Sequence, residues 1–198
     1  MSHGTHRYVV SINVAAARVI EVGGRRVASA IGKRPVDVPV AVHTLGLDGD
    51  EQADPTVHGG LAKAVYAYPV EHYPVWRTLR AQARAALWDE PLPPGAFGEN
   101  LTLAGLLEAD AFVGDRLCFE GGVEIAVSEP RRPCAKFDAA MGFRQASKMM
   151  AQSGQCGFYL QVVVPGTLAA GERFVVRPGE RAVSIAELFR ARVRPGRY

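Results

Sequence analysis

Cysteine is rare in this sequence and follows no common disulfide or metal-binding pattern. The 198 residues include three cysteines, Cys118, Cys134 and Cys156, which stand 16 and 22 positions apart. An odd, widely spaced set does not predict a disulfide framework, and no CxxC pair indicates a zinc or iron–sulfur site. If Cys134 binds a metal, the protein offers a single thiolate, and the remaining ligands must arrive with the metal.

Long apolar runs are also missing. No uninterrupted run approaches the roughly 18 residues that would suggest a membrane span. The N-terminus lacks a charged and then apolar signal followed by a cleavage site. We therefore expect a cytoplasmic protein that does not contact a membrane. The chain length and the ordinary apolar fraction of 48% are typical of one globular domain with a substantial core.

Lysine is scarce, with 4 residues against 19 arginines, and the net charge is only +3. The basic residues form no dense block, and no aromatic–basic RNA motif is visible, so nucleic-acid binding is not expected. Because lysine is rare, its positions are informative. Lys63 and Lys136 both fall in stretches that suggest chemistry.

Short strands dominate the predicted secondary structure. Gly-Gly pairs at residues 23–24 and 121–122 supply the positive φ values of tight turns and predict two hairpins. Further strands are predicted at Tyr8–Asn13, Val36–Val42, Val65–Tyr68, Leu101–Leu103, Phe158–Val164 and Arg173–Val176.

Helical signals are fewer. Apolar spacing predicts one helix over Tyr73–Trp88 and a second within Lys136–Gln152, although Gly142 weakens the middle of the second. A third, short helix is expected to start at Ser184, where Glu187 completes a capping box. These elements predict a mainly β (α+β) fold, with a strongly curved sheet or barrel and peripheral helices.

The stretch SEPRRPCAKFD places Cys134 behind two arginines and a proline, and two residues before a lysine. Positive neighbours favour the thiolate, the form of cysteine that attacks electrophiles and binds metals. Arg131, Arg132 and Lys136 could also hold an anion. The pattern predicts a reactive or ligating Cys134, with a buried structural thiol as the alternative. For Cys118 and Cys156 the structural alternative is the expected one.

The stretch HGGLAKAV places adjacent glycines between a histidine and a lysine. Gly59 and Gly60 allow close backbone approach to a ligand, with His58 on one side and Lys63 on the other. Lys63 could act as a point charge against a phosphate, or it could be an exposed lysine at the start of a strand. From these residues alone, both interpretations stay open.

Two further stretches carry weaker signals. In PPGAFGENLTL, Glu99 and Asn100 precede a short strand, and asparagine can both donate and accept in one contact. A structural turn is the alternative there. The acidic residues Asp48, Asp50, Glu51 and Asp54 lack the ligand spacing of a calcium loop. A solvated loop is the favoured interpretation of that acidic set.

Four blocks of the sequence, in this order, resemble the MOSC family, the molybdenum cofactor sulfurase C-terminal domain, and particularly its small stand-alone YiiM-like branch. The blocks are GDEQADPTVHGGLAKAVYAYPVEHY, GAFGENLTLAGLLEADAFVGDRL, VSEPRRPCAKFD and GFYLQVVVPG. The resemblance implies a MOSC-type β-barrel over residues 1–178 and a short C-terminal helical tail over residues 179–198. The YiiM-like branch usually has a longer helical extension, so the tail is expected to be a shortened one.

The resemblance also implies that the chain binds the molybdenum cofactor, with Cys134 as catalytic residue and metal ligand. A pyranopterin brings its own sulfur ligands and a phosphate, so one protein thiolate suffices and the basic residues have a target. The positions that match family motifs, or are candidates for the phosphate, are His58, Gly59, Gly60, Lys63, Glu99, Asn100, Arg131, Arg132 and Lys136. An association with pyridoxal phosphate comes with the family name alone.

The activity implied by the resemblance is the reduction of small N-hydroxylated compounds of the hydroxylaminopurine type. The sequence has no iron–sulfur cysteine set and no flavin or nicotinamide fingerprint, so a separate electron-donor protein is expected, and a homodimer is left open. The main alternative is a cofactor or sulfur carrier with a persulfide on Cys134. A cysteine hydrolase pairing Cys134 with His58 or His43, and a non-catalytic binding module, are the remaining hypotheses.

Overall fold

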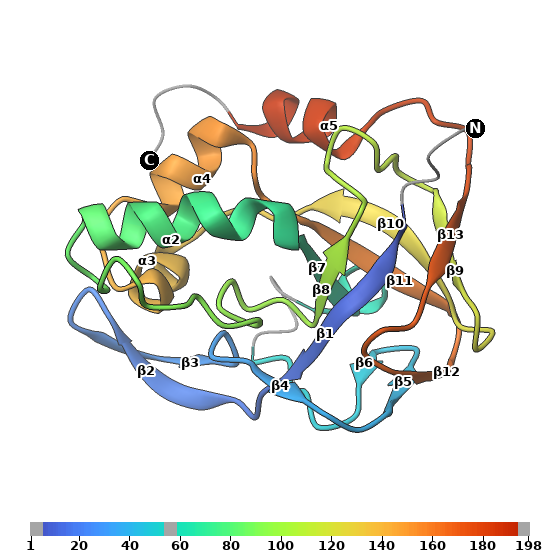
Figure 1. The fold of residues 1–198 in the computed structure, drawn as a ribbon, viewed down its shortest axis with the longest axis horizontal. Coiled ribbons are helices and arrows are strands. Elements are labelled where there is room, and N and C mark those ends of the chain that lie inside the picture. Colours follow the sequence, from blue (N-terminus) through green and yellow to red (C-terminus); the bar gives the residue numbers. More distant parts are fainter. Residues whose placement is uncertain (1–5, 54–58, 194–198) are drawn as a thin grey trace.

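The computed structural model describes residues 6–53 and 59–193, which build one large sheet with smaller elements around it (Figure 1). The order of the eight-stranded sheet is β13-β9-β10-β11-β7-β8-β1-β4. Its strands are β1 (Tyr8–Val14), β4 (Arg34–Val36), β7 (Val65–Pro69), β8 (Leu101–Ala104), β9 (Arg116–Phe119), β10 (Glu124–Pro130), β11 (Phe158–Val164) and β13 (Phe174–Arg177). Neighbouring strands are antiparallel, except for the parallel pair β7–β8. This confirms the mixed, mainly β class that was predicted.

The smaller elements lie around the ends of this sheet. A three-stranded sheet pairs β12 (Gly166–Leu168), β5 (Val40–His43) and β6 (Gly46–Leu47), and β2 (Arg18–Val22) with β3 (Arg25–Ser29) form a hairpin. Two 3-10 turns, η1 (Leu61–Lys63) and η2 (Val70–His72), flank β7. The helices are α2 (Tyr73–Gln82), α3 (Ala135–Met141), α4 (Ala146–Ser153) and α5 (Ile185–Arg192). The hairpin and α2–α4 lie on the left of Figure 1, away from β9 and β13.

The two ends of the large sheet approach each other without forming a complete ring. An isolated bridge joins Tyr8 to Arg173, and the backbone N–H of Val9 donates to the carbonyl of Glu172 at 2.9 Å. Within the described residues these contacts do not extend into a ladder between β1 and β13. The sheet is therefore curved, and the predicted closed barrel is not confirmed.

The helices lie where they were predicted, but they are shorter than predicted. The helix predicted over Tyr73–Trp88 ends at Gln82, and Leu87 and Trp88 are 71% and 66% exposed. The second predicted helix is two helices, because Gly142 adopts a left-handed φ of 78° that ends α3. The capping box of Ser184 and Glu187 is confirmed at the start of α5.

One predicted strand is in fact parts of two strands. The run Val36–Val42 divides into the end of β4 and the start of β5, and Val38 between them is 66% exposed. Pro39 has no N–H to give to a strand ladder, which explains why the apolar run does not continue as one strand. The segment instead passes from one sheet to the other.

A buried aromatic cluster supports the loops that approach the sheet beside α2 and α3. The rings of Tyr68 and Phe97 stack with centroids 3.9 Å apart, and Trp76 meets Phe137 edge-on at 5.2 Å. Such contacts fix ring orientations as well as burying apolar area. The cluster therefore anchors both the loop at Phe97 and the start of α3. Among the described residues, no helix has the length and apolar character that a bilayer crossing demands.

Candidate functional site

A cavity opens where six separated parts of the chain meet. Its walls come from the segment after β3, the loop at residues 50–53, η1, β7, the loop at residues 97–100 and the connection from β10 to α3, with Tyr159 of β11 beside them. The cavity holds about 660 Å³ of empty space, open solvent included. The sequence blocks of the predicted site therefore converge on one place.

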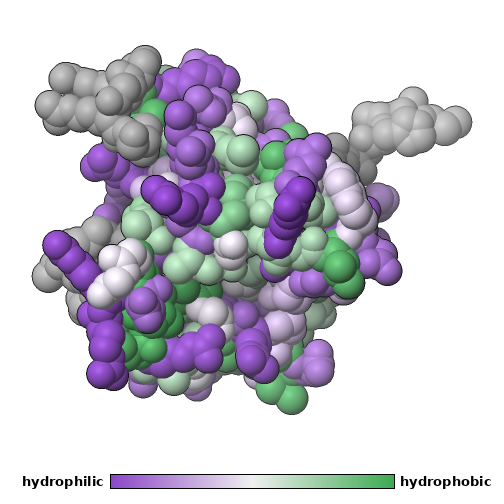
Figure 2. All heavy atoms as spheres, turned by 90° about the vertical axis from the view of Figure 1, so that its left-hand side faces the viewer, coloured by the Kyte–Doolittle hydropathy of each residue, from purple (hydrophilic) through white to green (hydrophobic). Residues whose placement is uncertain are grey.

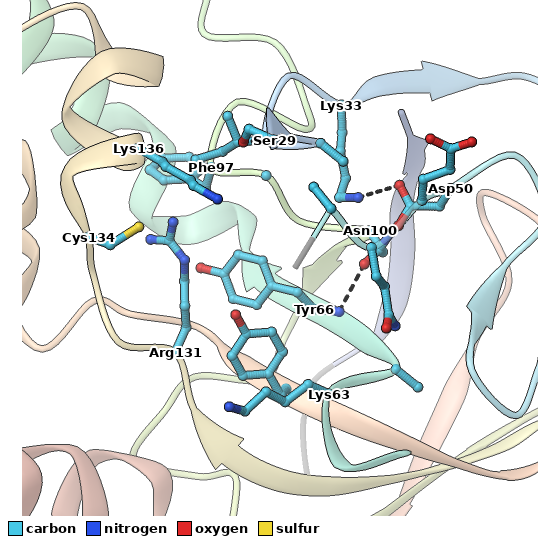
Figure 3. Close-up of a pocket in the computed structure, with 18 residues that line it drawn as sticks. Ser29, Lys33, Asp50, Lys63, Tyr66, Phe97, Asn100, Arg131, Cys134 and Lys136 are labelled. Atoms are coloured by element: carbon cyan, nitrogen blue, oxygen red, sulfur yellow. Dashed lines mark hydrogen bonds and ion pairs between the residues drawn. The ribbon is translucent and has the colours of Figure 1, made fainter. Parts of the chain in front are cut away.

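Five of the predicted site residues line this cavity: Lys63, Asn100, Arg131, Cys134 and Lys136. Arg131, Cys134 and Lys136 stand together at one side of the close-up view, with Asn100 across the cavity (Figure 3). We call Arg131, Cys134 and Lys136 the cationic wall. Lys63 lies below them in that view.

The other predicted residues are placed differently. Gly60 is partly exposed, and its N–H donates to Oε1 of Gln52, a cavity-lining side chain, at 3.1 Å. Gly59 is also partly exposed and does not line the cavity. Arg132 is exposed and does not line the cavity either. His58 lies outside the described residues. His43 is exposed and contacts Asp48 at 2.7 Å, away from the cavity lining.

Cys134 is the cavity's thiol. It is half-buried at the N-terminal boundary of α3, directly after the buried end of β10. Cys156 is fully buried, and burial raises the pKa of its thiol well above the ordinary value. Cys118 is half-buried on β9, outside the cavity. These placements fit the expected division into one accessible site thiol and two structural ones.

Arg131 is a buried cation held by aromatic rings and a thioether. Its residue is 4% exposed, its guanidinium lies 5.3 Å from the Tyr66 ring and 4.9 Å from the Phe137 ring, and Nη1 donates to the Met150 sulfur at 3.2 Å. Among residues 6–53 and 59–193, no carboxylate is within ion-pair distance of it. Its charge is thus stabilised by π faces, by sulfur and by the neighbouring Tyr159 hydroxyl.

The phenols near Arg131 do not neutralise it near pH 7. Burial raises the pKa of Tyr66 well above its ordinary value and raises the pKa of Tyr159 to about 12. Burial by itself would lower the pKa of Arg131, but Tyr66, Tyr159 and Cys134 reverse this, so the net shift is upward. Arg131 therefore stays charged, while its phenol neighbours stay protonated until strongly alkaline pH.

The opposite side of the cavity carries a second cation that is neutralised within the protein. Lys33 forms a close ion pair with Asp50, and the two side chains are each 7% exposed. Burial lowers the pKa of Lys33, although Asp50 opposes that shift. Asp50 also accepts from the N–H of Ala15 at 2.9 Å and from Nδ2 of Asn100 at 2.8 Å. We call Lys33, Asp50 and Asn100 the neutralised wall.

Asn100 ties three strands to this wall. Its Oδ1 accepts from the N–H of Tyr66 at 3.1 Å, and its Nδ2 donates to the carbonyl of Asn13 at 3.3 Å. The asparagine therefore fixes the register of β7 and β8 against β1 while it also lines the cavity. The dual donor and acceptor role predicted for Asn100 is realised within the protein.

Glu99 is placed behind the cavity surface. The carboxylate is fully buried and accepts from the N–H groups of Gly95 and Phe97 at 2.7 and 3.0 Å, and from the hydroxyl of Tyr73. Burial raises its pKa, and these hydrogen bonds oppose the rise. Glu99 holds the loop that carries Phe97 and Asn100, and its side chain does not line the cavity.

Lys63 shares a carboxylate with the C-terminal helix. Its Nζ lies 3.7 Å from Oε1 of Glu129 and 5.9 Å from the centre of the Tyr159 ring. The other oxygen of Glu129 accepts from Nη1 of Arg192, in the last turn of α5, at 2.8 Å. Ser128 Oγ also donates to the carbonyl of Ala62, so β10 holds the turn that presents Lys63.

Sequence reasoning selected Asn100 of the neutralised wall but missed Lys33 and Asp50. Asp50 was placed in a solvated acidic loop, which is correct for the exposed Asp48 and Glu51 and wrong for Asp50. Lys33 stood in no recognisable motif. The scarcity of lysine was the one available signal, and it singles out Lys33 as readily as Lys63.

Comparison with known proteins identifies the class of protein that this fold and cavity define. The MOSC domain profile matches residues 54–175, which include Cys134 and most of the cavity. The chain belongs to the MOSC domain family, and within that family it is YiiM-like.

Several relatives carry this assignment. The chain is 35% identical to the uncharacterised protein YflK of Bacillus subtilis strain 168, over 89% of this chain and 76% of that protein. It is 39% identical to the protein YiiM of Escherichia coli K12, over 72% of this chain and 61% of that protein. It is also 33% identical, over 82% of this chain, to a Gibberella moniliformis protein named reductase, of which it covers 28%. The crystal structure of YiiM from Geobacillus stearothermophilus matches with a TM-score of 0.74 at 34% identity, covering 94% of this chain and 84% of that one.

Proposed function

We propose that this protein is a molybdenum-cofactor-dependent oxidoreductase that reduces N-hydroxylated compounds with electrons from a separate donor. An oxidoreductase-like role is supported by the family and by the relative named reductase. The metal, the substrate class and the donor are the parts that we propose. The net reaction consumes two electrons and two protons, breaks the N–O bond of R–NH–OH, and yields R–NH₂ and water.

The observation that carries the proposal is the buried charge of Arg131 beside the cavity thiol. Burying a cation without a carboxylate partner is costly, because buried charges are normally paired. Arg131 is 4% exposed and lines the cavity together with Cys134. An anionic ligand that also binds a soft metal satisfies both residues. The phosphate and metal of a molybdopterin are such a pair.

The donor set of the cavity fits this group. Cys134 offers the one soft ligand, and the described residues contain no cluster of three or more His, Cys, Asp or Glu side chains that could hold a metal unaided. A metal there would depend on ligands that come with its cofactor. Lys63, Arg131 and Lys136 would hold the phosphate.

Within this proposal the protein binds and orients the cofactor and the substrate and shields them from solvent. When bound, the cofactor supplies the two-electron redox centre that this chain lacks. Glu99 and Asn100 keep the loop at residues 97–100 in place through their internal hydrogen bonds. Lys136 donates to the carbonyl of Ala28 at 2.9 Å and so holds the segment that leads to Ser29 against the cavity mouth.

The proposal is tested by measuring molybdenum bound per protein after expression in a host that makes the cofactor. Wild type is expected to carry near-stoichiometric molybdenum, and Cys134→Ser to lose nearly all of it. Cys118→Ser is the matched control, because Cys118 is also half-buried but lies outside the cavity. Wild-type protein supplied with a viologen reductant should then reduce a hydroxylaminopurine.

Two outcomes would contradict this function. Sulfane sulfur on Cys134 in protein without molybdenum would indicate the carrier function that the sequence left open. Stoichiometric molybdenum without reduction of any N-hydroxylated substrate, even with a strong reductant, would indicate a binding module.

A further inference from the structure

A second groove lies directly behind one wall of the cavity. It runs between the β2–β3 hairpin, the loop at residues 92–96 and α3. Ile31 and Lys33 line both the groove and the cavity, so a single chain segment separates the two spaces. At Gly32, in this segment, a Cβ would meet Nη2 of Arg18 at 2.4 Å. The Arg18 guanidinium thus lies against the shared wall.

The floor of the groove is apolar and its edges are cationic. Leu92, Pro93 and Pro94 face Ala139 and Ala140 across it. The cations are Arg18, Arg34 and Arg80, together with Lys33 of the shared wall, and the lining includes a single acidic residue, Glu21. We call this surface the arginine groove. An apolar centre bordered by arginine is the composition of a protein-binding surface.

The arginines of this side are mostly without carboxylate partners. Arg80 pairs with Glu90 at 3.7 Å, but within the described residues no carboxylate pairs with Arg18 or Arg34. Exposed cations without such partners continue outward from the groove along the hairpin, α2 and the α3–α4 region: Arg25, Arg26, Arg77, Arg84, Arg132, Arg144 and Lys148. Figure 2 faces this side and shows hydrophilic side chains standing around a paler, more apolar centre.

On the other side of the molecule, around β9 and β13, most arginines form ion pairs with carboxylates. Arg116 and Arg177 both pair with Glu124, at 3.1 and 3.3 Å, and Arg181 pairs with the buried Asp115 at 3.2 Å. The same chain therefore neutralises most arginines around β9 and β13 and leaves most of those around the groove unmatched. Uncompensated charge on one face attracts a partner of opposite sign and speeds its approach.

We propose that the arginine groove is the docking surface for an acidic electron-donor protein. This inference rests on the proposed function, because a reductase that is supplied by a separate donor needs a surface on which that donor binds. A donor seated in the groove is separated from the cavity only by the segment that carries Ile31 and Lys33. Two one-electron transfers across this wall supply the two electrons that break one N–O bond.

The test uses an acidic [2Fe–2S] ferredoxin as probe and measures its binding to cofactor-free protein by titration calorimetry at several salt concentrations. The groove variant is Arg18→Glu with Arg34→Glu. The matched control is Arg173→Glu with Arg190→Glu, two exposed arginines on the side of β13 and on α5 that form no ion pair within residues 6–53 and 59–193 and give the same change in net charge. Circular dichroism confirms that both variants fold.

The groove variant is expected to weaken ferredoxin binding by about tenfold or more, the control by less than about threefold, and salt to weaken wild-type binding. Equal losses in the two variants, or no binding of ferredoxin at low salt, would overturn the docking site. So would a DNA oligonucleotide that binds more tightly than ferredoxin and depends on the same arginines. Molybdenum content measured on both variants keeps this test separate from the test of the cofactor.

Discussion

The two walls of the cavity each contain a buried cation, and they neutralise it in opposite ways. On the neutralised wall, Lys33 has Asp50, which is itself held by Ala15 and Asn100. On the cationic wall, Arg131 has aromatic rings and a thioether. A charge that the protein pairs internally is part of the fold, whereas a buried charge that it leaves to π faces is available to a ligand. The comparison separates the structural side of the cavity from its binding side.

The largest effect is expected from breaking the neutralised wall. Asp50→Asn leaves the buried Lys33 without a counter-ion, and removing one partner of a buried pair costs ~3–5 kcal/mol. Urea denaturation of cofactor-free protein measures this loss. Asp48→Asn is the control, because its pair with His43 is about two-thirds exposed, at 67% and 62%, and should contribute little. Equal losses in the two variants would show that the neutralised wall is not structural.

Glu99→Gln tests whether the carboxylate behind the cavity supports the loop. The two N–H groups of Gly95 and Phe97 donate to different oxygens of Glu99, and a glutamine side chain has only one acceptor oxygen. One of these N–H groups therefore loses its acceptor, which should lower the unfolding free energy by ~1–3 kcal/mol. Because burial raises the pKa of Glu99, the folded state binds the proton of this group more tightly than the unfolded state does. The resulting stabilisation is fully present below the unfolded pKa of 4.5 and is lost as the pH rises through the folded pKa.

The stability advantage of wild type over Glu99→Gln should therefore shrink as pH rises above 4.5. Urea unfolding of both proteins at pH values on either side of 4.5 measures this difference. An advantage that grows with pH would contradict the upward shift of the Glu99 pKa.

Arg131→Met should barely alter stability, because a flexible apolar side chain of similar length replaces a desolvated charge; we expect a change below ~1.5 kcal/mol in either direction. The variant should instead abolish the protection that added inorganic phosphate gives wild type against thermal unfolding, since a ligand stabilises only the state that binds it. Thermal scans with and without phosphate test this. A loss of stability as large as that of Asp50→Asn would remove the distinction between the walls.

The smallest stability change is expected at Lys136, whose hydrogen bond to the carbonyl of Ala28 is exposed. Lys136→Met should change the unfolding free energy by less than ~0.5 kcal/mol while it reduces the phosphate protection. Lys148→Met, on the exposed face of α4, is the control and should change neither quantity. Unchanged phosphate protection in Lys136→Met would remove Lys136 from the anion site.

The parts of this molecule that could be predicted from sequence are those with local causes. Short apolar runs placed β7, β8 and β11, a glycine explained the break between α3 and α4, and a capping box marked the start of α5. Glycine and cationic patterns also selected Lys63, Arg131, Cys134 and Lys136, which the fold brings to one cavity.

The pairing of residues that lie far apart in the sequence could not be predicted from such local patterns. Asp50 looks like any acidic loop residue until the fold buries it against Lys33. The aromatic setting of Arg131 likewise depends on rings contributed by β7 and α3. The distinction between the two walls is thus a property of the tertiary structure, since each set of residues looks equally polar as sequence.

The carboxylate of Glu129 is divided between Lys63 in the cavity and Arg192 in the last turn of α5. Shortening the protein before Arg192 would leave that carboxylate to the lysine alone and make the entrance less positive. Arg192, which does not line the cavity, thereby helps to set how strongly the cavity attracts an anion.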